Sequence, residues 1–214
     1  MARDKGKPQG SARMPTVYPK QRPQIQELSG RDVFTLSGVV SEKEARGIID
    51  FALSLGLQHQ SSRGPKYGEA FRDNDRVSIE DEAVAQQLYT SLGIDQVFGP
   101  DPASGAVPVG LNPNLRFYRY RPGQRFGRHI DESVELGAGR FTAHTLLVYL
   151  SSVPRGGETI FYKRGRRVAA VAPQLGTALL HRHWPDCLEH EGAAVLEGDK
   201  WILRSDVVYQ RPRS

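Results

Sequence analysis

The stretch LRFYRYRPGQRFGRHID, Leu115 to Asp131, decides the fold because it ends in a histidine and an aspartate two residues apart. Residues i and i+2 of an extended strand point to the same side of a sheet, so His129 and Asp131 are predicted to face one space. Two histidines and one carboxylate form the facial triad that holds Fe(II) in non-haem oxygenases. The motif therefore supplies two of three ligands. The alternative interpretation is a surface histidine paired with a carboxylate.

A third ligand has to come from the later part of the chain, which offers four histidines. They are His144, His181, His183 and His190. His144 lies inside the apolar segment TLLVYL, and His181 and His183 end the segment GTALLHRH. His190 follows a turn and precedes a glycine-bounded segment. The chemistry of imidazole alone does not separate these four candidates.

The last predicted strand, KWILRSDVVY, carries two cations on one face. Lys200, Ile202 and Arg204 alternate with Trp201 and Leu203. Alternation alone slightly favours Trp201 and Leu203 as the core and leaves Lys200 in solvent. An inward lysine is costly unless an anion faces it. Lys200 is therefore a candidate for binding an anionic group only if this face is the inner one.

The pattern of elements predicts an α+β chain that is mainly β. Short apolar segments separated by Gly and Pro follow Asp131, which favours an antiparallel sandwich or jelly roll of about eight strands over residues 114–210. Two helices are predicted upstream, one from the capping box of Ser41 and Glu44 to Gly56, the other over residues 82–92. Residues 59–81 are predicted as loop or edge strand, in which Arg72, Asn74 and Arg76 are candidates for a substrate rim or a solvated loop.

Composition predicts a single domain with an appendage. The chain has 214 residues, 38% of them hydrophobic, and a net charge of +5. Residues 1–31 hold seven basic and two acidic residues, so the remainder is balanced. We expect residues 1–31 to be a disordered basic tail and residues 32–214 to form the domain. Deletion of residues 1–30 is expected to change the melting temperature little. Only the tail offers an electrostatic argument for nucleic acid.

The single cysteine and the lack of apolar runs bear on the compartment. Cys187 excludes intramolecular disulfides, which favours a reducing compartment, and a small buried apolar role is favoured for it over a reactive thiol. No run is long enough to span a membrane, and residues 1–20 lack an apolar leader. The expectation is a cytoplasmic or nuclear protein that does not bind membranes.

Five motifs carry a family resemblance. They are RYRPGQRFGRHID, TLLVYLSS, GGETIF, VAPQLGTALLH and HEGAAVLEGDKW, in that order. Together they resemble the prolyl 4-hydroxylase-like branch of the 2-oxoglutarate and Fe(II)-dependent dioxygenases over about residues 115–209. The resemblance implies a double-stranded β-helix, with the predicted helices outside it. It also overturns the solvent-facing interpretation of Lys200.

The resemblance implies roles for individual residues. His129, Asp131 and His190 match the three metal ligands, so His144, His181 and His183 are not expected to bind iron. Lys200 matches the residue that binds the distal carboxylate of 2-oxoglutarate, a role that Arg204 could share or replace. The other implied cosubstrate-binding residues are Tyr120, Thr145 and Tyr149.

The implied activity is a hydroxylase that uses Fe(II) and 2-oxoglutarate, with ascorbate as an optional reductant. Its substrate is unidentified. A prolyl residue of a protein or peptide is suggested, and a small molecule is the alternative. Two other interpretations stay open, a zinc hydrolase, which leaves Lys200 unexplained, and a non-catalytic sandwich that binds a protein or nucleic acid through the basic tail.

Overall fold

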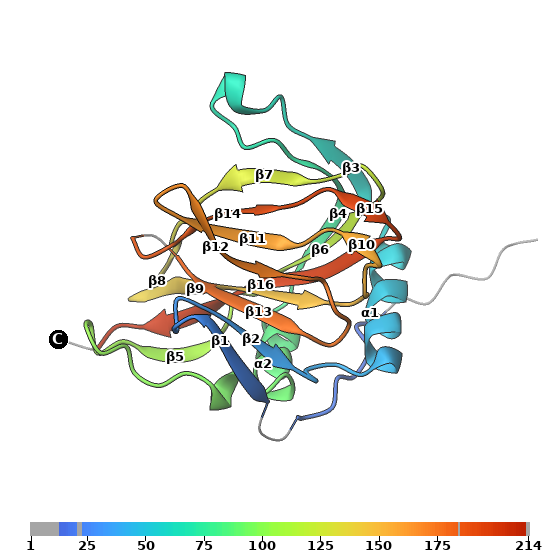
Figure 1. Ribbon diagram of the computed structural model, residues 1–214. Helices are drawn as coiled ribbons and strands as arrows, with labels where there is room; N and C mark the ends of the chain where they lie inside the picture. Colours follow the sequence, from blue (N-terminus) through green and yellow to red (C-terminus); the bar gives the residue numbers. More distant parts are fainter. Residues whose placement is uncertain (1–12, 21–22, 184, 213–214) are drawn as a thin grey trace, which may run out of the picture.

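The major sheet is the larger of two facing layers of antiparallel strands (Figure 1). The computed structural model describes residues 13–20, 23–183 and 185–212. Ten strands join this sheet in the order β1-β2-β13-β9-β16-β6-β4-β3, with β5 beside β16 and β8 beside β9. Their bounds are Gln24–Ser29 (β1), Val33–Ser37 (β2), Gln58–Ser61 (β3), Asp73–Glu80 (β4), Val107–Leu111 (β5), Asn114–Tyr120 (β6), Glu135–Gly137 (β8), Arg140–Tyr149 (β9), Ala178–Arg182 (β13) and Lys200–Gln210 (β16).

The minor sheet has four strands in the order β12-β11-β14-β7. They are Phe126–His129 (β7), Thr159–Lys163 (β11), Arg166–Val171 (β12) and Glu189–Gly192 (β14). A short pair, Arg155–Gly156 (β10) and Val195–Glu197 (β15), closes one end. Gly156 is required there, because a Cβ atom would lie 2.3 Å from the carbonyl oxygen of Ala194.

The two antiparallel sheets confirm the predicted jelly roll. Within the described residues, strands β6 to β16 fall in the predicted range 114–210. The sequence predicts about eight strands there, and the excess consists of the short strands β8, β10 and β15. The segment 59–81, predicted as loop or edge strand, contributes β4 and most of β3, which join the major sheet beside β6.

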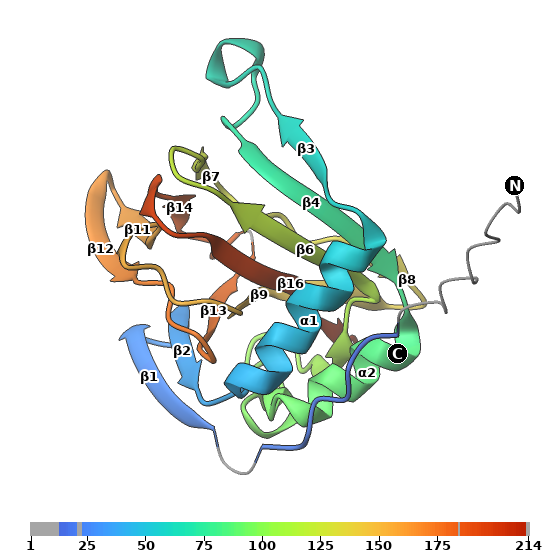
Figure 2. The same ribbon diagram turned by 90° about the vertical axis from the view of Figure 1, so that its right-hand side faces the viewer.

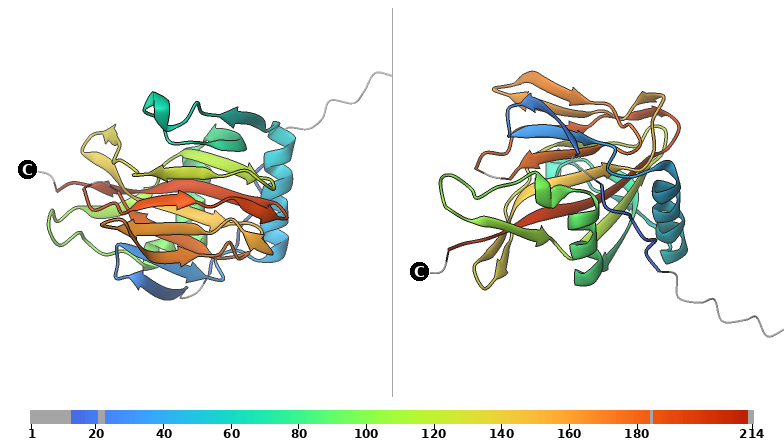
Figure 3. Two further views of the ribbon diagram at one scale, coloured as in Figure 1. Left: turned by 45° about the horizontal axis from the view of Figure 1, so that its top comes forward. Right: turned by 90° about the horizontal axis from the view of Figure 1, so that it is seen from below.

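Two helices pack against the outer side of the major sheet, opposite the minor sheet (Figure 2). The first, α1 (Glu42–Leu55), begins at the predicted capping box of Ser41 and Glu44 and ends at Gly56, whose φ is 79°. The second, α2 (Glu82–Ser91), is capped by Asp81 and is followed by Gly93, with a φ of 74°. Short 3-10 turns, Pro65–Tyr67 (η1) and Ile94–Gln96 (η2), complete the helical structure of the described residues. Figure 3 shows α2 and β5 from below.

This layering buries both faces of β16. Trp201 and Leu203 pack in the core that includes the helices. Ile202 belongs to a second apolar cluster between the sheets, and Lys200 on the same face is only 3% exposed. The solvent-facing position that alternation favoured for Lys200 is therefore wrong, and Lys200 is buried as the resemblance implies. No helix of the described residues is both long and apolar enough to cross a membrane.

The predicted tail is not uniform. Residues 1–12 lie outside the described residues, so the disorder predicted for them stays a prediction. Farther on, β1 pairs with β2, and Val17 is buried. Lys20 forms an ion pair of 2.8 Å with Glu44, which also accepts the backbone N–H of Tyr18. The prediction of disorder is thus wrong for β1 and for residues 13–20, because backbone pairing and a buried ion pair leave little trace in hydrophobic patterns.

We therefore predict, against the expectation from the sequence, that deleting residues 1–31 lowers the melting temperature clearly, whereas deleting residues 1–12 does not. The longer deletion removes β1 and the ion pair of Glu44. Thermal unfolding of the two truncated chains and the full chain measures the difference. Equal melting temperatures for all three would show that the segment adds nothing to stability.

The carboxylate of Glu44 allows a separate prediction, on how the contacts of residues 13–20 with α1 contribute to stability at different pH values. Burial opposes its ionisation, but hydrogen bonds from Lys20, Ser41 and Tyr18 outweigh burial and lower its pKa to about 2. A lowered pKa stabilises the fold above the unfolded value near 4.5, and the stabilisation is lost as the pH falls toward 2. Glu44→Gln should cost about 1–3 kcal/mol at neutral pH and progressively less between these two values.

Candidate metal and cosubstrate site

The register of two neighbouring strands of the minor sheet creates the site. His129 ends β7, and His190 lies on β14 directly opposite it. Asp131 follows β7 by two residues, as the spacing predicts. The ligand atoms of His129, Asp131 and His190 lie within 4.8 Å of one another. Each histidine Nε2 is 3.7 Å from an oxygen of the carboxylate.

Hydrogen bonds fix the tautomer of both histidines. The Nδ1 atom of His129 lies 2.8 Å from the carbonyl oxygen of Gly127, and that of His190 lies 2.9 Å from the carbonyl oxygen of Leu188. A carbonyl accepts only, so Nδ1 must carry the proton and donate it. Nε2 then presents its lone pair to the site, the arrangement found in metal-binding histidines.

The charges of the three groups also suit a metal. Burial, followed by His190, lowers the pKa of His129 to about 3, and burial lowers the pKa of His190 as well. Burial by itself would raise the pKa of Asp131, but Arg204 and the neighbouring histidines hold it well below its ordinary value. Two neutral imidazoles and an ionised carboxylate are the protonation states that metal binding requires. The residues therefore fit a divalent ion.

Asp131 has two further partners, which hold one side of its carboxylate. The hydroxyl of Thr145 donates to Oδ2 at 2.6 Å, and Nη2 of Arg204 lies 2.9 Å from the same oxygen. Thr145 in turn lies 3.0 Å from Nε2 of His183. The resemblance implied that the hydroxyl of Thr145 binds the cosubstrate. In the structure this hydroxyl donates its hydrogen bond to Asp131, a candidate metal ligand, and so helps to orient the carboxylate.

The remaining candidate histidines occupy three different places. His144 points away from the site and stacks on Tyr209. His183 reaches Asp131 only through Thr145. His181 lies inside the site, with Nε2 at 3.6 Å from Asp131 and without a hydrogen-bond partner among the described residues. The structure thus places His144 and His183 away from the metal site, whereas His181 lies within reach of it.

His181 also belongs to a second group with metal-ligand spacing, together with Cys187 and His190. Burial raises the pKa of the Cys187 thiol to about 11, so the thiol is protonated at neutral pH. A protonated thiol is a poor metal ligand. The group that contains Asp131 is therefore the better candidate.

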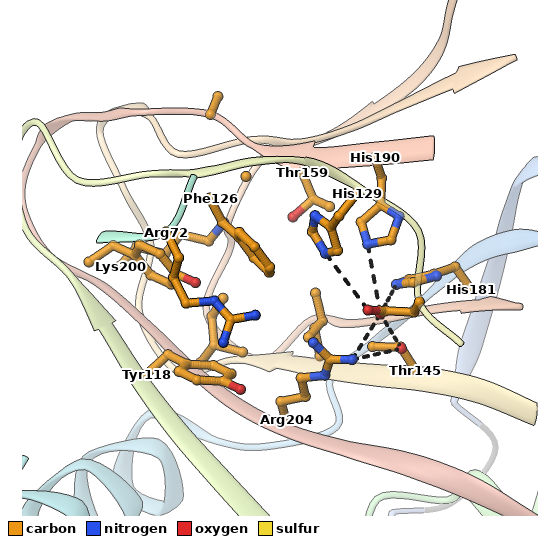
Figure 4. Close-up of a pocket in the computed structure, with 16 residues that line it drawn as sticks. Arg72, Tyr118, Phe126, His129, Thr145, Thr159, His181, His190, Lys200 and Arg204 are labelled. Atoms are coloured by element: carbon orange, nitrogen blue, oxygen red, sulfur yellow. Dashed lines mark hydrogen bonds and ion pairs between the residues drawn. The ribbon is translucent and has the colours of Figure 1, made fainter. Parts of the chain in front are cut away.

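The site opens into a cavity between the two sheets (Figure 4). Dashed lines in the figure mark the ion pairs and hydrogen bonds of one carboxylate, which the distances given above identify as that of Asp131. Lys200 lies on the opposite side of the cavity from His181 and His190. The residues that line the cavity are Arg72, Tyr118, Tyr120, Phe126, His129, Asp131, Thr145, Leu147, Thr159, His181, His190, Gly192, Ala193, Lys200, Ile202 and Arg204. A cation and a metal-ligand set thus face each other across one enclosed space.

Lys200 makes no ion pair with any described residue. Its Nζ donates to the carbonyl oxygen of Gly157 at 2.6 Å and lies over the rings of Tyr120 and Tyr149, at 5.7 and 5.5 Å from the centroids. Burial lowers its pKa to about 7, against the opposing effect of Glu158. A buried cation without an acidic partner fits a site for an anionic ligand.

The other predicted cosubstrate residues divide between cavity and wall. Tyr120 lines the cavity beside Lys200. The hydroxyl of Tyr149 lies 2.8 Å from that of Thr159, so this tyrosine supports a wall residue. Arg204 is already paired with Asp131. The arrangement favours Lys200 over Arg204 as the partner of a distal carboxylate, which stays a prediction.

Sequence reasoning missed the apolar wall of the site. Phe126 stacks on His129 with centroids 3.8 Å apart, and the guanidinium of Arg72 lies 4.2 Å from the Phe126 centroid. Phe161 stacks on His190 from the other side. Arg72 was predicted only as a possible rim residue. The signal that could have indicated this wall was the position of Phe126, three residues before His129. Asn74 is fully buried and Arg76 half-buried, so neither belongs to a solvated loop.

A jelly roll that brings two neutral histidines and one carboxylate to a cavity with a buried lysine defines a class, the non-haem Fe(II) oxygenases. The sequence profile of the 2OG-Fe(II) oxygenase superfamily matches residues 115–205. This part of the chain therefore resembles the Fe(II)- and 2-oxoglutarate-dependent dioxygenases, and the curated relatives that the chain is similar to are prolyl 4-hydroxylases by name.

Curated relatives are similar to this chain over most of its length. Prolyl 4-hydroxylase 2 of Arabidopsis thaliana is 29% identical over 209 residues, which cover 83% of this chain and 67% of the relative. Five further prolyl 4-hydroxylases or probable prolyl 4-hydroxylases of that plant are matched over 41 to 60% of their own lengths. The chain thus spans only part of most of the curated relatives it matches.

Two solved structures share the fold. A viral collagen prolyl hydroxylase from Paramecium Bursaria Chlorella virus-1, in a 2OG complex, has a TM-score of 0.58 at 20% identity and covers 86% of this chain and 99% of its own. A prolyl hydroxylase from Trichoplax adhaerens, in complex with a hypoxia inducible factor peptide fragment, has a TM-score of 0.61 at 15% identity, with 84% of each chain covered.

The hydrogen bond from Thr145 to Asp131 yields a prediction. Thr145→Val keeps the shape of the side chain but removes the donor, and we expect metal affinity to fall about 10–100-fold. Competition between the protein and a chromophoric chelator for Co(II) measures this. Thr159→Val is the matched control, because the hydroxyl of Thr159 bonds with Tyr149 instead. Equal affinities for the two variants would show that the hydroxyl does not support Asp131.

The lowered pKa of Lys200 yields a second prediction, on pH. Below pH 7 the free protein carries a charged Lys200 that can pair with a carboxylate of 2-oxoglutarate. Above pH 7 a proton has to be taken up on binding, so the Kd should rise by up to about tenfold per pH unit. Titration calorimetry of the Zn(II)-loaded protein measures this. Lys200→Arg stays charged, so its Kd should change less with pH, and parallel profiles would exclude Lys200 as the partner.

Proposed function

We propose that this chain is a hydroxylase that uses Fe(II) and 2-oxoglutarate and acts on a prolyl residue of a peptide or protein. The observation that carries the proposal is the cavity with His129, Asp131 and His190 at one side and the unpaired Lys200 at the other. The names of the plant relatives and the peptide complex of the Trichoplax adhaerens enzyme support the substrate class. The use of ascorbate as an optional reductant stays a prediction.

The residues of the chain divide the work of the proposed reaction. His129, Asp131 and His190 would hold the iron, which with 2-oxoglutarate and dioxygen supplies the oxidation that places a hydroxyl group on a C–H bond, leaving succinate and carbon dioxide. Lys200 orients the cosubstrate through its distal carboxylate. Arg204 and Thr145 hold Asp131 ionised and in one orientation. Phe126 and Phe161 cover the two imidazoles and exclude water.

The substrate would approach from the side of β3 and β4. A second hollow beside the cavity is lined by residues of that hairpin, Gln60, Ser61, Ser62, Glu69, Ala70 and Arg72, and by Phe126, His129, Ile130 and Asp131. Arg72, Phe126, His129 and Asp131 line both spaces. An extended peptide lying in the hollow could therefore place one side chain at the metal ligands.

A direct prediction follows from the proposal. Iron-loaded protein incubated with 2-oxoglutarate and proline-containing peptides should produce succinate and peptides that gain one oxygen atom, measured by mass spectrometry. His129→Ala, Asp131→Ala and His190→Ala should each lower metal content and activity by one to two orders of magnitude or more. His144→Ala is the control, because His144 faces the opposite side of β9. Retained iron and activity in His190→Ala would show that the third ligand is misassigned.

A further inference from the structure

Four exposed cations gather at the turn between β11 and β12. They are Lys163, Arg164, Arg166 and Arg167, here called the basic turn. None of them forms an ion pair with a described residue. The two nearest acidic residues along β14 are engaged elsewhere, because Glu191 accepts the hydroxyl of Tyr162 and Glu189 pairs with Arg128. The basic turn therefore presents an uncompensated positive charge.

The backbone of the basic turn is strained at an arginine. Lys163 pairs with Arg166, so the loop has only two residues, Arg164 and Gly165, with φ of 51° and 73°. Positive φ at both positions is the pattern of a type I′ turn, in which Asn-Gly is preferred. A left-handed conformation costs a residue with a Cβ roughly 1–2 kcal/mol. An arginine held in this conformation is a local cost that points to a function of its side chain.

The basic turn lies near the candidate metal site. Tyr162 on β11 lies opposite Glu189 on β14. The next residue of β14, His190, lies opposite His129 on β7. The turn is thus at the end of the minor sheet where β7 finishes (Figure 1). Arg128 connects the two places, because its guanidinium lies 3.7 Å from the centroid of the Tyr162 ring. Strands are about 4.8 Å apart, so the turn lies on the order of 10–15 Å from His129.

We propose that the basic turn binds an acidic segment of the peptide or protein substrate, an inference that rests on the proposed function. An extended peptide advances about 3.3 Å per residue, so the acidic residues would lie about three to five positions from the hydroxylated residue. The substrate class becomes a proline followed or preceded at that distance by a cluster of aspartates, glutamates or phosphorylated residues. Opposite charges at exposed positions mainly set recognition and the rate of association.

An acidic peptide fits the surface better than nucleic acid. Glu189 and Glu191 lie on β14, between the basic turn and β7. A phosphate backbone carries a negative charge at every nucleotide. Between the turn and the metal site it would have to pass Glu189 and Glu191, whose two charges Arg128 offsets only in part. A peptide can confine its charges to the segment on the turn and leave neutral residues above β14.

The experiment measures binding apart from catalysis, in the full chain without added metal. The probes are a fluorescein-labelled peptide with one proline and a glutamate run about four residues from it, the same peptide with glutamines, and labelled single-stranded DNA. Anisotropy should show that the glutamate peptide binds most tightly. Arg166→Gln with Arg167→Gln should raise its Kd about tenfold at low salt and progressively less as salt increases.

The matched control is Lys43→Gln with Arg46→Gln, two exposed cations on α1, which should leave the Kd unchanged. Equal binding of glutamate and glutamine peptides, or equal losses in the two double variants, would overturn the proposal. DNA that bound more tightly than the glutamate peptide and depended on the basic turn would also overturn it. If the glutamate peptide binds through the turn and no peptide is hydroxylated, the proposed function fails and the docking surface stands.

The strained arginine gives a test that a purely structural turn would not pass. Arg164→Asn suits the left-handed backbone and should raise the melting temperature while weakening binding of the glutamate peptide. Arg164→Lys keeps both charge and strain, so it should retain binding. Arg164→Asn that raised the melting temperature and bound the peptide as tightly as the parent chain would exclude a role for Arg164 in docking.

Discussion

The buried carboxylate of Asp131 is the constraint around which the site is built. Its charge is held between the sheets by Arg204, the hydroxyl of Thr145 and three imidazoles. Burying an unpaired carboxylate is costly, so these neighbours are required for the fold as well as for the chemistry. Arg204 and Thr145 come from the major sheet, and His129 and His190 from the minor sheet. The carboxylate therefore couples the packing of the two layers to the geometry of the metal ligands.

A division of charge within the cavity follows from this arrangement. Arg204 is neutralised by Asp131, while Lys200, four residues earlier on the same strand face, has no acidic partner among the described residues. The two cations look equivalent in the sequence but differ in what they face. One holds a ligand of the candidate metal site, and the other leaves room for an anion from outside.

Local signals in the sequence predicted the local structure well. Ser41, Glu44 and Gly56 set the ends of α1 through hydrogen bonds and backbone angles that depend on a few neighbouring residues. Alternation failed for Lys200 because both faces of β16 are covered, so neither face has to be polar. The third ligand could not be chosen by chemistry alone, because only the register of β14 against β7 brings His190 opposite His129. The resemblance assigned Thr145 to the cosubstrate. Its hydrogen bond to Asp131 could not be predicted from the sequence, because this bond depends on how the two sheets pack.

The origin of the groups on the two sides of the cavity has a consequence for selectivity. The imidazoles of His129 and His190 belong to the minor sheet, whereas Lys200, which forms no ion pair with a described residue, belongs to the major sheet. A molecule that reaches from these two histidines to Lys200 therefore bridges the two layers. The distance between the two sheets then sets the length of the ligand that can contact both of them. If 2-oxoglutarate bridges the layers as proposed, a dicarboxylate one carbon shorter or longer would reach only one of them. The spacing of the sheets, and the apolar residues that set this spacing, would then select the chain length of the ligand.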